Sequence, residues 1–211
     1  MEKPLVSIIT SSFNQGQFIE QTILSVLNQD YPNIEHIIID GGSTDNTLNI
    51  LYKYSNKITW VSEKDKGQSD AYNKGLKISK GEIIGMLNSD DFYVDVNAVS
   101  HVVNLFQLNK SIDVIYGNAV WVDHNNKVLK VNLKPKFSQK RLQRFDFIPH
   151  PAAFIKRSSI PTPFFREDLH FAMDYDLWLR MMEKGCKFMF TNKIIAAMRH
   201  HSLAKSVNSK A

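Results

Sequence analysis

The sequence predicts an α/β fold built on an open, mostly parallel, Rossmann-like sheet whose strands are joined by right-handed helical crossovers. Short apolar runs alternate with helical patterns through the first half of the chain. These runs are nearly continuous in Ile, Val and Leu, which is typical of parallel strands buried on both faces. A polar cluster follows each of them. The 211 residues are enough for one such domain.

Four strands and three helices are expected in this first half. The first helix has apolar residues at helical spacing after Asn14, a possible cap, and Gly81 offers a left-handed stop after the third. The expected strands are Leu5–Thr10, Ile34–Asp40, Ile58–Ser62 and Ile83–Leu87, and the expected helices are Gly16–Asn28, Thr47–Tyr54 and Ser69–Ser79.

The alternation changes after Asp91, where a smaller β/α region is expected. A turn signal at residues 124–126 separates two strands, and the segment Lys134–Arg144 is basic and irregular. The expected helices are Val96–Leu108 and Tyr175–Glu183, and the expected strands are Val114–Val122, Lys127–Val131, Ala152–Ile155, Lys187–Phe190 and Ile194–Met198.

Composition narrows the class of protein. Lys and Arg number 26 against 21 Asp and Glu, a net charge of +5 that suggests an anionic ligand or an acidic membrane surface. The cations form no stripe with interleaved aromatic residues, so nucleic acid is not an expected partner. Cys186 is the one cysteine, which makes the reducing cytoplasm the default compartment. No apolar run approaches the roughly 20 residues that span a bilayer.

Polar side chains gather where each early strand ends. In open α/β sheets the ligand crevice lies beyond the carboxyl ends of the strands, so four such endings describe one site rich in carboxylates. Turn and helix-cap chemistry is an equal alternative for any single cluster, and it explains Ser43–Asp45 well. It does not explain Asp90 and Asp91, where one cap would suffice. The clusters are Thr10–Asn14, Asp40–Asp45, Glu63–Gly67 and Asn88–Asp91.

The adjacent carboxylates of Asp90 and Asp91 predict a bound cation. Two such groups at the end of a buried strand repel each other and lose hydration, so one of them should protonate. A divalent ion, Mn²⁺ or Mg²⁺, would keep both charged and would share its shell with substrate phosphates and water. The chain has no phosphate-binding GxxxxGK[ST] loop, and no GxGxxG follows the first strand.

Five motifs in order resemble those of family 2 glycosyltransferases with a GT-A fold, in particular bacterial enzymes of O-antigen and capsular polysaccharide assembly. The resemblance implies that a sugar moves from a nucleotide sugar, UDP-linked by expectation, to an acceptor hydroxyl with inversion at the anomeric carbon. The motifs are SIITSSFN (7–14), IIDGGSTDNT (38–47), SEKDKGQSDAYNKG (62–75), GEIIGMLNSDD (81–91) and FAMDYDLWLR (171–180).

The resemblance also implies roles for single residues on the donor side. Asp40 is expected to accept a hydrogen bond from uracil, and Asp90 and Asp91 to hold the metal and diphosphate. In the motif that ends with Asp90 and Asp91, the family usually has an Asp where this chain has Asn88. This leaves Asp91 as the expected direct ligand of the metal. The other donor-site residues implied are Ser11, Ser12, Phe13, Asn14, Asp65, Asp70 and Asn73.

Asp174 matches the family's catalytic base. The alternative is that it only caps the following helix, whereas Asp176 is expected to be structural or to face solvent. His150 and the Arg199–His201 element match positions near the diphosphate or acceptor, and purely structural roles are weighed equally for them.

The whole chain is expected to be one GT-A domain. Residues 1–92 would bind the donor, residues 93–206 would hold the acceptor and catalytic half, and residues 207–211 would form a tail. The acceptor is expected to be a saccharide or a lipid-linked saccharide, and the protein to be cytoplasmic. Basic residues from Lys134 to Arg144 could touch the inner face of the membrane, with an ordinary solvated loop as the alternative. A sugar nucleotidyltransferase and a non-catalytic nucleotide-sugar-binding protein are the rival functions.

Overall fold

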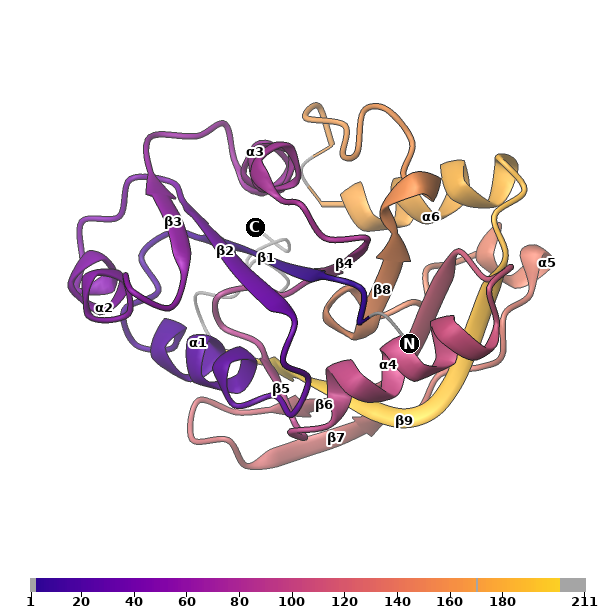
Figure 1. The fold of residues 1–211 in the computed structure, drawn as a ribbon, viewed down its shortest axis with the longest axis horizontal. Coiled ribbons are helices and arrows are strands. Elements are labelled where there is room, and N and C mark those ends of the chain that lie inside the picture. The colour runs from indigo at the N-terminus through magenta and orange to yellow at the C-terminus, as the bar shows by residue number, and fades with distance from the viewer. Residues whose placement is uncertain (1–2, 170, 202–211) are drawn as a thin grey trace.

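A computed structural model of the chain describes residues 3–169 and 171–201 (Figure 1). Its elements follow one another as alternating strands and helices through the first half and as a strand-rich region in the second. The strands are β1 (Val6–Ser12), β2 (Ile34–Asp40), β3 (Thr59–Ser62), β4 (Ile83–Met86), β5 (Phe92–Tyr93), β6 (Val114–Val122), β7 (Val128–Asn132), β8 (Ala153–Lys156) and β9 (Phe188–Arg199). The α-helices are α1 (Ile19–Leu27), α2 (Thr47–Lys53), α3 (Gln68–Ile78), α4 (Ala98–Leu108), α5 (Gln139–Leu142) and α6 (Met173–Glu183).

The strands form one mixed sheet in the order β3-β2-β1-β4-β8-β6-β9-β5, with β7 added beside β6. The first four strands are parallel, as predicted. Strand β8 is antiparallel to both of its neighbours, and β9 returns parallel to β6. The parallel half therefore brings the carboxyl ends of β1, β2 and β4 to one edge, where the crevice was expected.

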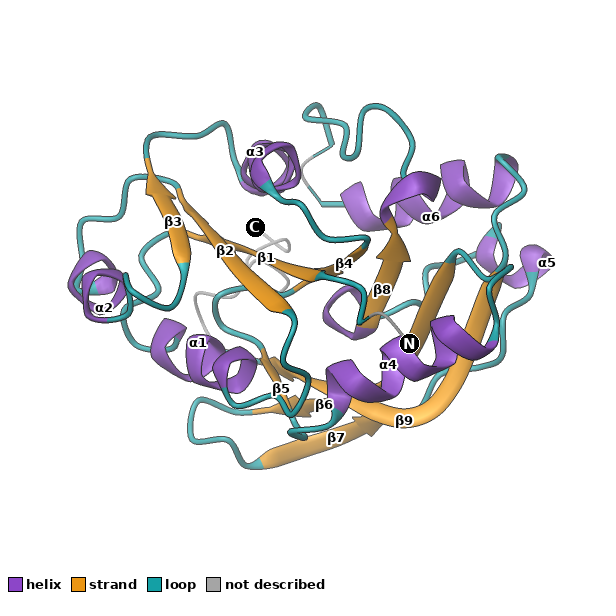
Figure 2. Ribbon diagram, viewed as in Figure 1, coloured by secondary structure: helices purple, strands orange, loops and turns teal. Residues whose placement is uncertain are grey.

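Helices cover both faces of the sheet, as Figure 2 shows. Helices α3 and α6 pack on one face through a core that includes Ile9 and Trp178. Helices α1 and α4 pack on the other through a core that includes Ile8 and Phe106. Because neighbouring residues of a strand point to opposite faces, Ile8 and Ile9 bury in different cores. This is why the apolar runs are continuous instead of alternating.

Close packing of α3 against the sheet depends on Gly75. A Cβ atom at this position would lie 2.3 Å from Cγ2 of Ile9, which real atoms do not allow. The glycine lets α3 approach β1 and β2, and so places the beginning of α3 beside the ends of those strands. The helix begins at Gln68, directly after the polar Glu63–Gly67 cluster.

Several predicted elements differ from the structure. Strand β3 lies at the sheet edge with exposed residues, so the prediction that it is buried on both faces is wrong. The two late strands at residues 187–190 and 194–198 are one bent strand, β9, which follows β6 through a register shift. The two-residue strand β5 was not foreseen. The short helix α5 lies inside the segment expected to be irregular.

Candidate active site

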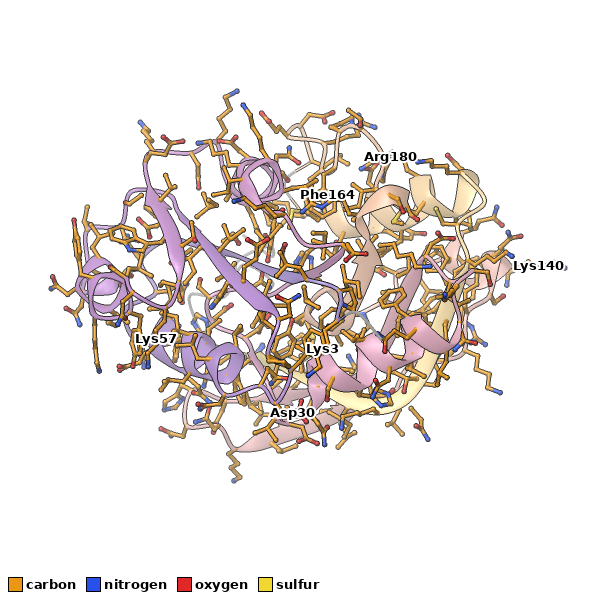
Figure 3. The ribbon with its side chains drawn as sticks, viewed as in Figure 1. Lys3, Asp30, Lys57, Lys140, Phe164 and Arg180 are labelled. Atoms are coloured by element: carbon orange, nitrogen blue, oxygen red, sulfur yellow. The ribbon has the colours of Figure 1, made fainter. Side chains whose placement is uncertain are left out.

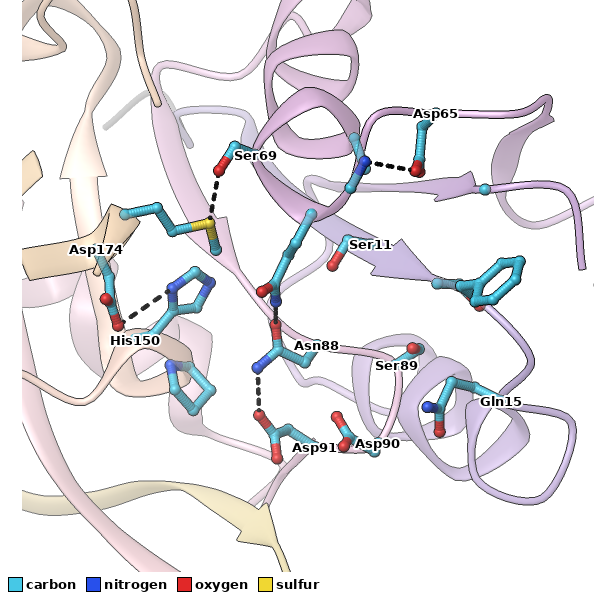
Figure 4. Close-up of a pocket in the computed structure, with 18 of the residues that line it drawn as sticks. Ser11, Gln15, Asp65, Ser69, Asn88, Ser89, Asp90, Asp91, His150 and Asp174 are labelled. Carbon is cyan, nitrogen blue, oxygen red and sulfur yellow. Dashed lines mark hydrogen bonds and ion pairs between the residues drawn. The ribbon is translucent and has the colours of Figure 1, made fainter. Parts of the chain in front are cut away.

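A cavity of about 1120 Å³ opens at the carboxyl edge of the parallel strands. Its walls come from the ends of β1 and β4, the loops after β2 and β3, the beginning of α6 and the end of β9 (Figure 4). Most of the predicted site residues meet there, namely Ser11, Ser12, Phe13, Asp65, Asp90, Asp91, His150, Asp174 and Arg199. The lining also includes residues that the sequence analysis did not name as site candidates, such as Gln15 and Gln68.

Asn14 joins two of the loops that form this wall. Its backbone is in the left-handed region, with φ at 51°, a conformation that Asn tolerates better than most residues. Its N–H donates to Ser43 Oγ across 2.7 Å, and its side-chain oxygen accepts the N–H of Thr44 across 2.9 Å. Asn14 is not among the lining residues of the cavity. The contacts make it a brace between the β1 and β2 loops, and its expected donor contact stays a prediction.

Asp40 is fully buried and its carboxylate is engaged by its own surroundings. One oxygen accepts the N–H groups of Gly42 and Ser43 and the hydroxyl of Ser62. The other accepts the hydroxyl of Ser43 at 2.5 Å. Four donors satisfy a buried carboxylate well, so Asp40 fixes the shape of the Gly41–Ser43 loop. Its expected contact with uracil stays a prediction.

Asp65 lies in the cavity wall next to Gly41. Its Oδ1 accepts the N–H of Gly67 across 2.8 Å. A Cβ atom on Gly41 would lie only 2.8 Å from Asp65 Oδ2, so the glycine makes room for this carboxylate. Burial raises the pKa of Asp65, and the negative charges of Asp70 and Asp40 add to the rise.

Asp70 and Asn73, both on α3, make structural contacts. Asp70 accepts the N–H of Lys66 and forms an ion pair with Lys74 at 3.2 Å. The amide of Asn73 both donates to the carbonyl and accepts from the N–H of Phe165, each across 2.9 Å. These two hydrogen bonds fasten the segment before α6 onto α3. Neither residue is among those lining the cavity, and their donor-binding roles stay predictions.

Asp91 is buried at the turn after β4. Its Oδ1 accepts the backbone N–H of Arg199 across 3.0 Å, and its Oδ2 accepts the amide of Asn88 across 2.9 Å. Burial raises the pKa of Asp91 well above its usual range, and the charge of Asp90 raises it further. Asn88 in turn accepts hydrogen bonds from Gln68 and from the Tyr72 hydroxyl. The side-chain oxygen of Asn88 is thus occupied by hydrogen bonds from within the protein, and the NH₂ group of Asn88 orients the Asp91 carboxylate.

The Arg199–His201 element reaches the same turn from the end of β9. His201 Nε2 lies 3.0 Å from an Asp90 carboxylate oxygen, and its ring packs on Phe18. The guanidinium of Arg199 lies between the rings of Phe18 and Phe92 and donates to the carbonyl of Asp90. Its remaining donors bind the side chains of Gln21 and Asn126 and the carbonyls of Asp123 and His124. Arg199 therefore holds in place the turn Asn88–Asp91 after β4, which we call the acidic turn.

Asp174 enters the cavity from the first turn of α6. The helix is preceded by Ala172 at the cap position, so Asp174 is not its N-cap; its Oδ1 accepts the N–H of Tyr175. The other oxygen lies 3.9 Å from Nδ1 of His150, whose buried ring packs against Tyr72. Asp176 faces away from this arrangement and binds Arg180 at 2.7 Å, in agreement with a structural role.

Asp146 is a carboxylate that the sequence analysis missed. Part of the residue remains exposed, but desolvation of its carboxyl raises the pKa to about 7, and the charge of Asp174 adds to this rise. The N–H of Ile148 donates to Asp146 Oδ1 across 3.0 Å, and this hydrogen bond lowers the pKa of Asp146 in part. The only signal in the sequence was its position four residues before His150, which is too weak to predict proximity to Asp174.

The acidic turn fits a divalent cation. Asp91 is a desolvated carboxylate with a raised pKa, beside a second carboxylate and an imidazole, and a cation would favour the charged forms of both acids. Over residues 3–169 and 171–201, no group of three or more His, Cys, Asp and Glu side chains is arranged to hold an ion alone. The protein would therefore supply Asp90 and Asp91, and diphosphate and water the rest, as Mg²⁺ and Mn²⁺ sites commonly do.

Comparison with known proteins decides the family. The family model described as "Glycosyl transferase family 2" matches residues 7–162, which is most of the chain. The chain belongs to this family. It is 33% identical over 195 residues to a chondroitin synthase of Escherichia coli, an alignment that covers 90% of this chain and 28% of that protein. It is also 33% identical over 195 residues to a hyaluronan synthase of Pasteurella multocida, covering 20% of that protein. The chain thus spans only 20% to 28% of the lengths of these two relatives.

Solved structures confirm the GT-A fold of this family 2 domain. The crystal structure of Staphylococcus aureus TarS 1–349 in complex with UDP-GlcNAc superposes with a TM-score of 0.77 at 20% identity, covering 97% of this chain and 61% of that one. A mannosyltransferase of Pyrobaculum calidifontis in complex with GDP-Man and Mn²⁺ superposes with a TM-score of 0.73 at 16% identity, covering 94% and 57%. In the described part of the family 2 domain, no helix has the length and apolar character needed to cross a bilayer.

Proposed function

We propose that this domain is an inverting glycosyltransferase that moves a sugar from a UDP-linked donor to an acceptor hydroxyl during assembly of a bacterial surface polysaccharide. One observation carries the proposal. Asp174 and the Asp90–Asp91 pair enter one cavity from different elements and lie apart in it (Figure 4). An inverting displacement needs this separation, because the base and the leaving diphosphate act on opposite sides of the sugar.

Asp174 would take the proton of the acceptor hydroxyl as that oxygen attacks the anomeric carbon. His150, whose Nδ1 lies 3.9 Å from Oδ2 of Asp174, would orient the carboxylate. Residues Asp90 and Asp91 would hold a divalent cation, which when bound supplies positive charge for the departing diphosphate. Arg199 and Asn88 would hold the Asp91 carboxylate in position, and Arg199 would also hold the backbone carbonyl of Asp90. The Asp90 carboxylate would be positioned by His201.

The nucleotide would lie against the β1, β2 and β3 loops, within the half formed by residues 1–92. We infer that Asp65 reads the base in place of Asp40, the residue that the resemblance implied, because Asp65 lines the cavity whereas the Asp40 carboxylate already accepts four hydrogen bonds within the protein. Uracil presents an N–H that a carboxylate can accept. The UDP complexes of TarS support this choice of base, although the similar mannosyltransferase is in complex with GDP-Man.

The acceptor would enter from the half formed by residues 93–206, and we propose a saccharide or a lipid-linked saccharide. The similar proteins named chondroitin and hyaluronan synthases are consistent with a polymer as the product. We place the reaction in the cytoplasm at the inner face of the membrane, where nucleotide sugars and lipid-linked acceptors meet.

A panel of UDP-sugars, each incubated with Mn²⁺ with and without saccharide acceptors, tests this function. Release of UDP that depends on one donor and one acceptor is the expected result. Release of pyrophosphate from UTP and a sugar phosphate would instead indicate a nucleotidyltransferase. Tight binding of UDP-sugars with no turnover on any acceptor would favour a non-catalytic binding protein.

A further inference from the structure

Charge is segregated within the chain in a way that the active site does not explain. Residues 124–145 hold seven Lys and Arg residues and no Asp or Glu, whereas the rest of the chain holds 19 Lys and Arg against 21 Asp and Glu. We call the exposed face of these residues, which runs from the β6–β7 turn through β7 to α5, the β7–α5 surface. Lys140 extends from the edge of the molecule there (Figure 3). The seven cations are Lys127, Lys130, Lys134, Lys136, Lys140, Arg141 and Arg144.

Large apolar side chains are exposed on the same surface. Of fourteen large hydrophobic residues exposed in the described chain, five lie between residues 128 and 145. Leu129, Val131 and Leu133 alternate along β7 and its continuation, so they project from one side of the strand. Leu133 is 71% exposed, and Val128 and Phe145 complete the set.

Nothing within the described residues covers this surface. Among the described strands, β7 pairs with β6 alone, and no other described strand lies along its second edge. None of the seven cations forms an ion pair within residues 3–169 and 171–201, whereas cations elsewhere often do, such as Lys74 with Glu63 and Arg180 with Asp176. Large apolar groups gathered on one exposed face, with cations around them, are typical of an interaction surface.

We propose that the β7–α5 surface docks on a bilayer that contains anionic phospholipids. The apolar side chains would enter the headgroup region, and each cation near the surface would add about 1 kcal/mol of attraction to anionic lipid. A second copy of this chain fits less well, because self-association would bring like charges together. A soluble polyanion would use the cations but would leave the apolar residues unexplained.

This surface adjoins the cavity. Trp121 of β6 lines the cavity, and its partner in the β6–β7 ladder is Lys130. Docking would therefore bring the acceptor side of the site close to the membrane, a consequence that rests on the proposed function. The docking itself does not, since vesicle binding needs neither donor nor turnover.

Co-sedimentation of the whole chain with vesicles tests the proposal, using phosphatidylcholine vesicles with and without phosphatidylglycerol. We expect binding to the anionic vesicles only, and weaker binding as salt is added. Two variants should each lose at least about tenfold in affinity. The first is Leu129→Ser with Val131→Ser and Leu133→Ser. The second changes Lys136, Lys140, Arg141 and Arg144 to Gln.

Matched controls are Leu108→Ser, an 80% exposed position on α4, and a variant in which Lys57, Lys77, Lys80 and Lys184 become Gln. These should bind as the unaltered chain does. Equal binding to neutral and anionic vesicles, or an equal loss in the controls, would overturn the proposal. A dimer detected by light scattering, and lost when Leu129, Val131 and Leu133 are changed to Ser, would also overturn the proposal. The β7–α5 surface would then bind a second copy of the chain instead of a membrane. If a variant fails to fold, the binding of the unaltered chain still tests the proposal. Binding to anionic vesicles that is absent, or that does not weaken as salt is added, would contradict it.

Discussion

The backbone N–H of Arg199 donates a hydrogen bond to Asp91 Oδ1 across 3.0 Å, and the guanidinium of the same residue donates to the carbonyl of Asp90 across 3.0 Å. The two partners are more than a hundred residues apart in sequence. Strand β9 thereby fixes both members of the acidic turn from the second half of the chain. The position of the proposed metal carboxylates is therefore a property of the whole fold and not of the local SDD sequence.

Arg199→Lys should destabilise the protein by about 2–4 kcal/mol, because several buried acceptors lose their donors and the lysine cannot replace the fork of the guanidinium. Arg199 is only 4% exposed, so water cannot take over these bonds. The midpoint of urea unfolding measures the effect. Arg144→Lys, at an exposed position, is the control and should change little. Similar midpoints for the two variants would contradict the organising role of Arg199.

Removal of the metal should weaken UDP binding. In calorimetry with Mn²⁺, Asp91→Asn should lower UDP affinity at least about tenfold, to the level that the unaltered protein shows in EDTA. The amide keeps the shape of the side chain but loses the charge that attracts the ion. Asp30→Asn, on the exposed surface, should bind as the unaltered protein does. UDP affinity that responds neither to the chelator nor to Asp91→Asn would exclude a metal-bridged diphosphate.

Gly41→Ala should weaken UDP binding through Asp65. The added methyl group would lie 2.8 Å from Asp65 Oδ2, so the carboxylate must move away from its place in the wall. In an Asp65→Ala background the same change should have almost no further effect, since the group that it displaces is gone. The four affinities form a double-mutant cycle. Independent, additive losses would show that the two residues do not act together.

The sequence was informative where the physics is local. Continuous apolar runs predicted β1, β2 and β4, and the polar residues after them meet in one cavity because parallel strands end at one edge. It was less informative where contacts between distant parts of the chain determine the length of a strand or the environment of a side chain. The polar Thr191 and Asn192 lie between two expected strands, yet β9 continues through them by bending along β6. The saturation of Asp40 depends on Ser62 from a neighbouring strand, which no spacing reveals.

His36 should make the protein sensitive to acid. It is buried, hydrogen-bonds to Thr10 across 3.0 Å, and burial lowers its pKa from 6.5 to about 3. An unfolded histidine takes up a proton below about pH 6.5, whereas the folded one stays neutral down to about pH 3. The stability that His36 contributes is thus complete above pH 6.5 and is lost progressively as the pH falls toward 3, by up to about 1.4 kcal/mol per pH unit. His36→Gln should have a flatter dependence of unfolding free energy on pH between 6.5 and 4, and parallel curves for the two proteins would contradict the assignment.

Asp174→Asn should cut sugar transfer by at least about 10²-fold while leaving UDP-sugar affinity in the presence of Mn²⁺ nearly unchanged. The amide is nearly isosteric with the carboxylate and can still accept the N–H of Tyr175, so the beginning of α6 should survive the change. It cannot take the acceptor proton, which is the step that the proposed mechanism assigns to this residue. Asp176→Asn is the matched control, two residues along the same helix, where the carboxylate binds Arg180 and has no part in the cavity wall. It should lower stability more than turnover. A near-normal rate for Asp174→Asn, or a product that keeps the anomeric configuration of the donor, would remove Asp174 from the chemistry and leave it as a residue that only supports the first turn of α6.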